Sequence, residues 1–176
     1  MRIFIGIDLH EAAKEYFSAL SGKLKKNITG RFTSSGNFHV TLKFIGDTGR
    51  NDLMRIQESV DGAVEGHAPF SINVLRLSTF HRAGRHIIWA GFNPSPPLAA
   101  LYADMEKELA KRGFSEDRQA FLPHVTLARE AVIEDVGMLG LSLEQEIPVS
   151  EITIFESVRM DSGLVYLPKY KKELKG

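Results

Sequence analysis

Alternation between apolar and polar residues predicts strands along this chain, and a helical spacing of apolar residues predicts helices. Residues 38–44, FHVTLKF, alternate without interruption, which is typical of a strand with one buried face and one polar face. Residues 10–26 follow a different period, with apolar residues at Ala13, Phe17, Leu20 and Leu24. That spacing places the four side chains on one face of an amphipathic helix.

The same patterns, with turn residues as boundaries, divide the rest of the chain. The predicted strands are 2–9, 38–45, 70–80, 85–92, 121–130, 149–160 and 164–174, with a short strand at 31–33, and the predicted helices are 10–26, 51–64 and 98–112. Pro123 lacks an N–H, so its strand begins there or lies at a sheet edge. The turn Asp161-Ser162-Gly163 makes the last two strands a hairpin, whereas residues 132–145 show no clear pattern. This order indicates an α+β fold with antiparallel sheets.

A four-residue sequence, His-Val-Thr-Leu, occurs twice in strands of matching polarity. The copies begin at His39 and His124, which are 85 positions apart (124 minus 39), in a chain with six histidines. One copy in each half, with no linker between the halves, predicts an internal duplication that forms two lobes around one seam. A chain of 176 residues fits one such two-lobed domain, residues 1–176.

Composition narrows the possible functions. The 43% hydrophobic content allows a real core, and 22 basic against 22 acidic residues exclude a large electrostatic footprint for duplex nucleic acid while leaving a local basic groove open. The absence of cysteine excludes disulfides, zinc–thiolate sites and thiol nucleophiles. Neither a signal peptide nor a membrane-spanning apolar run is apparent, so we expect a cytoplasmic protein with no membrane association.

The repeated strands point to acid–base chemistry. Residues i and i+2 of a strand share a face, so His39 and Thr41 lie together, as do His124 and Thr126. A single strand histidine is usually structural, but two strands meeting across a cleft would bring two imidazoles and two hydroxyls into one small volume. Imidazole shuttles protons near neutral pH, and a hydroxyl can hold an anionic oxygen. Hydrolysis of a phosphodiester needs both functions.

These motifs and their flanking segments resemble the 2H phosphoesterases, named for two His-x-Thr motifs. Within that superfamily the sequence is similar to the RNA 2',3'-cyclic phosphodiesterases, once called 2'-5' RNA ligases. The resemblance rests on RIFIGIDL, FHVTLKFIGD, RHIIWAGF, FLPHVTLAR and ITIFESVRMDSGLVYLPKY, which together span nearly the whole chain. It implies two lobes whose antiparallel sheets line a central cleft, with helices outside.

The resemblance also implies roles for individual residues. His39 matches the proton donor to the leaving oxygen, and His124 matches the proton acceptor that activates water. Thr41 and Thr126 match the phosphate-binding hydroxyls, and Arg129 matches an arginine that often ends the second motif. The implied reaction opens a 2',3'-cyclic phosphate to a 2'-phosphate, without a metal or cofactor. The implied partners are RNA ends or nucleotides that bear such a phosphate, and we expect a monomer.

Two positions depart from the simplest expectation. In relatives, the residue that matches Phe80 is often followed by proline, whereas this chain has His81 there. The resemblance therefore does not predict the conformation of the loop before residue 85. Arg129 lies an odd number of residues after His124, so a regular strand would turn it away from the imidazole. A bulge or the end of the strand would reconcile Arg129 with a phosphate contact.

The remaining candidate residues favour structural roles. His10, His67, His81 and His86 stand in no repeated context, so we expect surface positions for them, and no zinc-binding pattern is present. Trp89, in an apolar strand, fits the core better than a base-stacking role, and Lys43 fits a solvated strand end better than a phosphate contact. Two alternatives to hydrolysis stay open, namely the reverse reaction that forms a 2'-5' linkage and a non-catalytic module that binds RNA ends.

Overall fold

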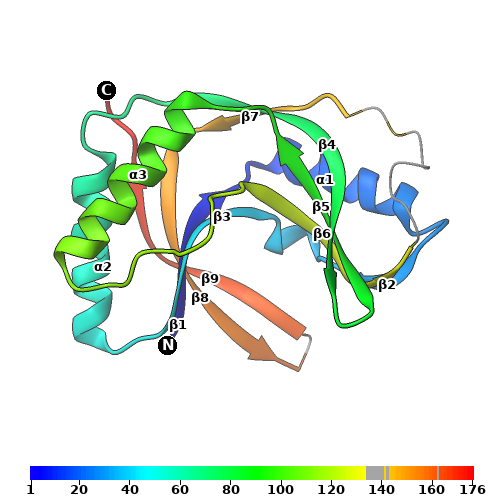
Figure 1. Cartoon of the computed structure of the whole chain (residues 1–176), viewed down its shortest axis with the longest axis horizontal. Coiled ribbons are helices and arrows are strands. Elements are labelled where there is room, and N and C mark those ends of the chain that lie inside the picture. Colours follow the sequence, from blue (N-terminus) through cyan, green and yellow to red (C-terminus); the bar gives the residue numbers. More distant parts are fainter. Residues whose placement is uncertain (134–140, 142, 162) are drawn as a thin grey trace.

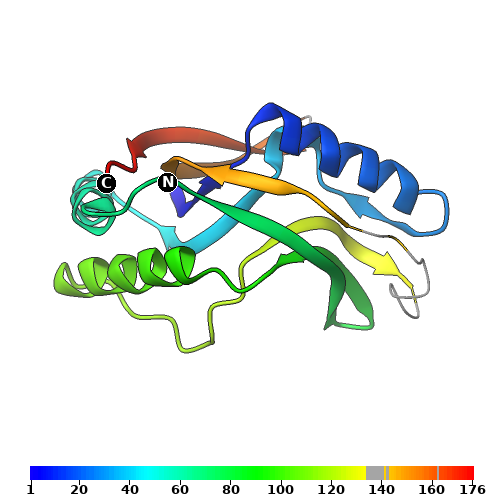
Figure 2. The same ribbon diagram turned by 90° about the horizontal axis from the view of Figure 1, so that it is seen from above.

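The computed structural model describes residues 1–133, 141, 143–161 and 163–176, and it places strands at the centre and helices at the periphery (Figures 1 and 2). The elements are β1 (Arg2–Asp8), α1 (Glu11–Leu24), β2 (Thr29–Phe32), β3 (His39–Asp47), α2 (Arg50–Val64), β4 (Phe70–Arg82), β5 (Arg85–Phe92), α3 (Pro96–Lys111), β6 (His124–Val132), β7 (Glu146–Val149), β8 (Glu151–Met160) and β9 (Gly163–Glu173).

The strands form two antiparallel sheets, and each sheet contains strands from both the N-terminal and the C-terminal half of the chain. The first has the order β3-β1-β8-β9 and the second the order β2-β6-β5-β4-β7. The C-terminal hairpin β8–β9 therefore completes the sheet of β1 and β3, while β2 extends the sheet of β6 along its edge. One continuous apolar core joins the inner faces of both sheets and the buried faces of all three helices.

The predicted α+β fold with antiparallel sheets is confirmed, and most element boundaries agree within a few residues. The four-residue β7 was missed, since it lies beside the unpatterned stretch 132–145 and contains Pro148. β6 begins directly after Pro123 and lies inside its sheet, so the edge alternative for this strand is wrong. β8 and β9 pair as the predicted hairpin, although Ser162 of its predicted turn lies outside the described residues. The single-domain assignment of residues 1–176 stays a prediction.

The two halves repeat one strand-pairing register. In the first sheet Asp8, Ile7 and Gly6 of β1 face His39, Val40 and Thr41 of β3, and in the second sheet Gly91, Ala90 and Trp89 of β5 face His124, Val125 and Thr126 of β6. After each threonine the motif strand holds one residue without a partner, Leu42 in β3 and Leu127 in β6. Both motif strands therefore carry a β-bulge at the same place in the motif.

Each bulge changes which residues face inward. In β3, Leu42 and Lys43 are both buried, and in β6, Leu127 and Ala128 are both buried. Because two consecutive residues point into the core, the alternation shifts by one position. The fifth residue after each histidine therefore lies on the same face of the strand as the histidine itself. That residue is Arg129 in β6, which is exposed.

The expected solvated position of Lys43 is wrong, because the bulge turns this side chain into the protein. Its Nζ lies 2.8 Å from Oε1 of Glu106 on α3 and 2.9 Å from Oδ1 of Asp117, in the segment that leads to β6. The backbone N–H of Asp117 also donates to Oε2 of Glu106 at 2.8 Å. The buried ammonium group of Lys43 thus connects the first motif strand, β3, to the segment that precedes the second motif strand, β6.

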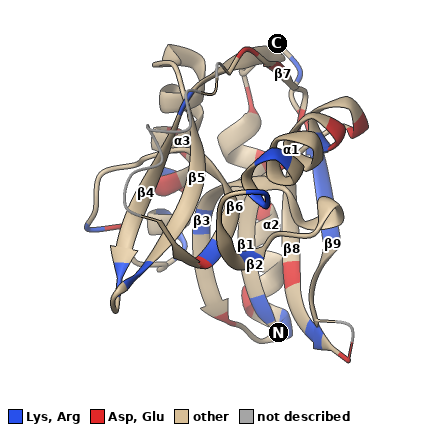
Figure 3. Ribbon diagram, turned by 90° about the vertical axis from the view of Figure 1, so that its right-hand side faces the viewer, with Lys and Arg blue, Asp and Glu red and all other residues tan. Residues whose placement is uncertain are grey.

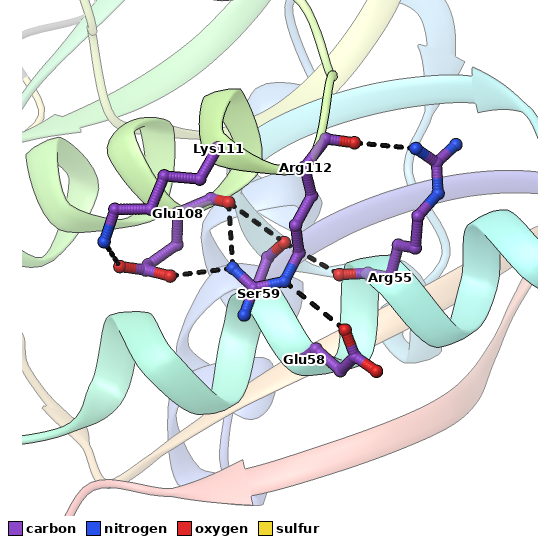
Figure 4. Close-up of polar contacts among 6 residues, drawn as sticks. All are labelled: Arg55, Glu58, Ser59, Glu108, Lys111 and Arg112. Atoms are coloured by element: carbon purple, nitrogen blue, oxygen red, sulfur yellow. Dashed lines mark hydrogen bonds and ion pairs between the residues drawn. The ribbon is translucent and has the colours of Figure 1, made fainter.

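Polar contacts join α2 to α3, which lie side by side at one end of the molecule (Figures 1 and 4). Arg55 donates to the backbone carbonyl of Arg112 at 2.7 Å, and the buried hydroxyl of Ser59 reaches the carbonyl of Glu108 at 3.4 Å. Arg112 in turn lies 3.5 Å from Glu58. These contacts hold the carboxyl end of α3, from which the chain runs toward the second motif.

Replacing Lys43 tests its connecting role. Lys43→Met removes the cation and leaves Glu106 unpaired, so the free energy of unfolding should fall by about 3 kcal/mol in denaturant titrations. The matched double variant Lys43→Met, Glu106→Leu removes both buried charges and should recover most of that loss. Equal stability of Lys43→Met and the parent protein would contradict the assignment.

Candidate active site

The imidazole of His39 is held by two neighbours on its own segment. Its Nδ1 lies 2.7 Å from the carbonyl oxygen of Asn37, and its Nε2 lies 3.0 Å from Oγ1 of Thr41. A carbonyl oxygen only accepts, so Nδ1 carries the proton and Nε2 of the neutral ring accepts from the threonine hydroxyl. The predicted pairing of His39 with Thr41 on one face of the strand is thereby observed.

His124 repeats this arrangement in the second sheet. Its Nδ1 lies 2.8 Å from the carbonyl oxygen of Leu122, again two residues before the histidine. The same argument places the proton on Nδ1 and leaves Nε2 as the basic nitrogen. Both imidazoles therefore share one tautomer, in which the nitrogen that can exchange a proton with a ligand is Nε2.

Aromatic rings surround each imidazole. The rings of Phe4 and Tyr166 both lie 4.9 Å from that of His39, and the Tyr166 contact is edge-on. Phe80 lies 5.3 Å from His124, and Trp89 lies 5.6 Å from it. These apolar contacts fix the ring planes and exclude water from the side of each imidazole.

Trp89 is buried, and its ring stacks on Phe80 at 4.8 Å. The expected core role of Trp89 is confirmed, with the addition that its packing also positions His124. Gly91, which follows it on β5, has no room for a side chain because a Cβ there would lie 2.7 Å from the Trp89 ring.

The bulge of β6 brings Arg129 to the cleft. Arg129 and His39 line one cavity of about 470 Å³, although they belong to different sheets. Its lining residues are Arg2, Phe4, Arg31, His39, Thr41, Phe44, Arg129, Ser157, Arg159, Leu164 and Tyr166. Of the two alternatives for Arg129, a bulge or the end of the strand, the structure has the bulge, and Arg129 lines the same cavity as His39.

Burial and positive charge both disfavour protonation of the histidines. Burial lowers the pKa of His39 to about 4, with the hydrogen bond to Asn37 opposing this and the charges of His124 and Arg129 adding to it. Burial also lowers the pKa of His124, against its bond to Leu122 and with help from Arg129. At neutral pH both rings are therefore neutral, beside a cationic cavity.

Three of the five site residues that sequence reasoning selected line this cavity, and His124 and Thr126 are not among its lining residues. His39, Thr41 and Arg129 line one cavity, while His124 and Thr126 lie two residues apart on the strand that carries Arg129. Sequence reasoning missed the other cavity arginines and Tyr166. They come from segments far from either motif, and no local pattern marked them. Within the described residues, no group of three or more His, Asp or Glu side chains is arranged to hold a metal ion.

Comparison with known proteins finds relatives that cover nearly the whole chain. The family described as the 2'-5' RNA ligase superfamily matches residues 22–158. The chain is 30% identical to the RNA 2',3'-cyclic phosphodiesterase of Thermotoga maritima, over 100% of this chain and 97% of that protein. It is 27% identical to the RNA 2',3'-cyclic phosphodiesterase of Methanothermobacter thermautotrophicus, over 94% of this chain and 95% of that protein.

Solved structures show the same fold. E. coli LigT complexed with 3'-AMP has a TM-score of 0.85 at 22% identity, covering 99% of this chain and 98% of that chain. TT0787 of Thermus thermophilus has a TM-score of 0.83 at 19% identity, covering 100% of this chain and 99% of that chain. The resemblance carried by the two His-x-Thr motifs is confirmed.

The lowered histidine pKa values can be measured directly. In an NMR titration of imidazole Cε1–H signals, assigned with His39→Asn and His124→Asn, the pKa of His39 should be about 4, and that of His124 below 6.5. Removing the nearby positive charge with Arg129→Gln should raise both pKa values, whereas the control Arg50→Gln should change neither. A His39 pKa near 6.5 in the parent protein would contradict the buried, cationic environment.

Proposed function

Because the chain belongs to the 2'-5' RNA ligase superfamily, we propose that it hydrolyses the 2',3'-cyclic phosphodiester of RNA ends or nucleotides to a 2'-phosphomonoester without a metal ion. The observation that carries this proposal is the matched pair of imidazoles. Each donates Nδ1–H to a backbone carbonyl and presents Nε2 for proton exchange, beside an arginine-lined cavity. A cyclic phosphate is a small anion whose opening needs one proton removed and one delivered.

The chemical step uses the two Nε2 atoms in opposite senses. Nε2 of His124 takes a proton from water, and the water oxygen forms a bond to phosphorus. The bond from phosphorus to O3' breaks, and O3' takes a proton from Nε2 of His39, which enters the step as imidazolium. The products are a 3'-hydroxyl and a 2'-phosphomonoester, with the proton on His124 returning to solvent or to His39.

Neutral and cationic donors hold the phosphate during this step. Oγ1 of Thr41 lies 3.0 Å from Nε2 of His39, and once that nitrogen is protonated it no longer accepts from Thr41, so the hydroxyl can donate to a phosphate oxygen beside the imidazolium. Thr126 has the matching position after His124, and Arg129 supplies a planar cation that suits phosphate oxygens. These groups stabilise charge that is present throughout the reaction and grows as the alkoxide leaves.

The proton-donor role of His39 needs the substrate. In the free protein the pKa of about 4 leaves very little of His39 in the imidazolium form that the step needs at neutral pH. A bound phosphate anion offsets the positive charge of Arg129 and favours the imidazolium, which raises the pKa of His39 in the complex. The assignment of acid to His39 and base to His124 comes from the family resemblance, so the roles need a test that separates them.

The alternatives are less well supported. Water at its high concentration favours hydrolysis over the reverse reaction that forms a 2'-5' linkage. A module that only binds RNA ends would not need two histidines in matching tautomers, since arginine and lysine bind phosphate without them.

A product assay tests the proposal. Purified protein with 2',3'-cyclic AMP in excess EDTA should release 2'-AMP alone, since O3' leaves and no metal takes part. Chromatography against 2'-AMP and 3'-AMP standards identifies the isomer. Release of 3'-AMP would contradict the leaving-group assignment, and activity lost in EDTA but restored by a divalent ion would contradict the metal-free mechanism.

Substitution of the four motif residues tests how they share the reaction. His39→Ala and His124→Ala should each lower kcat by roughly 10²- to 10⁴-fold, because each imidazole acts on a moving proton. Thr41→Ala and Thr126→Ala should cost less and should act partly through KM, because they bind oxygens that are already anionic. The double histidine variant should be little worse than the poorer single variant, because the two groups act as a unit.

A better leaving group separates the two histidines. A cyclic substrate with sulfur in place of O3' needs little protonation on leaving, since a thiol has a pKa near 8.5. With this substrate, the activity of His39→Ala relative to the parent protein should recover more than the activity of His124→Ala does. Preferential rescue of His124→Ala would reverse the two roles.

A further inference from the structure

A second cavity adjoins the site of the two histidines. It has a volume of about 290 Å³ and lies between β2, β6 and the tip of the β4–β5 hairpin. Arg82, Arg85 and His86 line it from the hairpin, while Arg31 and Arg129 line both this cavity and the catalytic one. The two cavities therefore meet at Arg31 and Arg129, and basic segments mark the hairpin tip and β2 in Figure 3.

The permanently charged basic residues at these cavities are all arginine. Six of the 11 arginines in the sequence line one or both cavities, namely Arg2, Arg31, Arg82, Arg85, Arg129 and Arg159. None of the 11 lysines does so, within the part of the chain that the structure describes. The only acidic residue described at either cavity is Glu130, whose carboxylate pairs with Arg31 at 3.0 Å. Although the protein has zero net charge, arginine is concentrated at these two cavities. Its guanidinium group forms paired hydrogen bonds with phosphate oxygens and stacks on aromatic rings.

This arrangement opposes local stability. Arg82 faces Arg85 as the last pair of the hairpin, and Arg31 faces Arg129 across β2 and β6. Like charges directly opposite each other on neighbouring strands are destabilising. An anion between such pairs would remove the repulsion.

Backbone strain gathers at the same cavity. Among the described residues, Ala83 (φ 49°) and Glu130 (φ 55°) are the two non-glycine residues with positive φ, and both line it. Ala83 belongs to the two-residue turn that sets Arg82 beside Arg85, and Glu130 follows Arg129 directly. Strained residues of this kind persist where function requires their geometry.

We infer that this second cavity binds the phosphodiester on the 5' side of the terminal nucleotide, so that the substrate is an RNA chain end rather than a mononucleotide. The inference rests on the proposed hydrolysis of a terminal cyclic phosphate. The reacting phosphate lies between His39 and His124, Arg129 lies at the junction of the cavities, and the preceding phosphate lies between Arg82 and Arg85. Single-stranded nucleic acid is bound elsewhere by such basic grooves, with strong salt dependence.

Three substrates with the same reacting group test the inference. They are 2',3'-cyclic AMP with a free 5'-hydroxyl, the dinucleotide ApA with a 2',3'-cyclic phosphate, and the same dinucleotide with an uncharged methylphosphonate linkage. The parent protein should show a kcat/KM about tenfold higher for the charged dinucleotide than for the other two, because only that substrate offers the second anion. Equal kcat/KM for all three would overturn the inference.

The matched variants place the effect at the hairpin. The double variant Arg82→Gln, Arg85→Gln should lose the higher kcat/KM for the charged dinucleotide and keep the parent kcat/KM for 2',3'-cyclic AMP. For the charged dinucleotide, the slope of log kcat/KM against log salt concentration should fall by about 1. The control Arg50→Gln, Arg118→Gln removes two arginines outside both cavities and should change none of these values. An equal effect of both double variants, or an unaltered dinucleotide preference in the hairpin variant, would overturn the assignment.

Thermal unfolding completes the test. Relief of like-charge repulsion means that the hairpin variant should unfold at the same temperature as the parent protein or higher. A lower unfolding temperature, with loss of activity on all substrates, would mean that the two arginines serve the fold instead. Absence of any activity of the parent protein on 2',3'-cyclic AMP and on the dinucleotide would contradict the proposed function itself, which separates that failure from failure of the second cavity.

Discussion

Directly after its threonine, each motif strand carries one residue that has no counterpart in the strand beside it, and much of the site depends on that extra residue. Without the bulge at Leu127, strict alternation would turn Arg129 away from His124 and out of the cavity that it shares with His39. Without the bulge at Leu42, the side chain of Lys43 would point toward the cleft and would not reach Glu106. The same local irregularity thus supplies a cavity-facing cation, Arg129, in one lobe and a buried connecting cation, Lys43, in the other. The duplication preserves backbone geometry and allows the chemistry of the side chain to differ.

The site balances two opposing demands on its imidazoles. Aromatic packing fixes each ring and desolvates it, which lowers its pKa, and Arg129 lowers it further. The hydrogen bonds to the carbonyls of Asn37 and Leu122 oppose this trend and also fix the tautomer. The resulting cavity is cationic while the imidazole of His39 stays neutral, so the cavity favours an anionic ligand. In the proposed reaction, the substrate supplies the charge that stabilises an imidazolium beside arginine.

Sequence reasoning reached the fold class and the four motif residues because these depend on local periodicity. Alternation marked both motif strands, and repetition singled out His39 and His124 from four other histidines. The parity of Arg129 raised a bulge in β6 as one of two alternatives. The bulge in β3 escaped notice because Leu42-Lys43 continues an apolar–polar alternation, and only pairing with β1 reveals the extra residue. Arg31 and Tyr166 reach the cavity through tertiary pairing of β2 and β9, which no local pattern encodes. β7 pairs for four residues with β4 and contains a proline, so its sequence lacked a strand signal.

The exchange of strands between the two sheets also governs the order in which the protein can be built. β1 lies between β3 and β8, so one edge of the earliest strand has no partner until residues 151–160 have been made. During synthesis, the apolar side chains of β1 must therefore wait for the last part of the chain, and the unpaired edge is open to mispairing in that interval. The pairing of β1 with β8 joins residues about 150 positions apart, a separation that slows folding. The first motif strand, β3, is thus translated early, but its sheet is complete only when translation is nearly over.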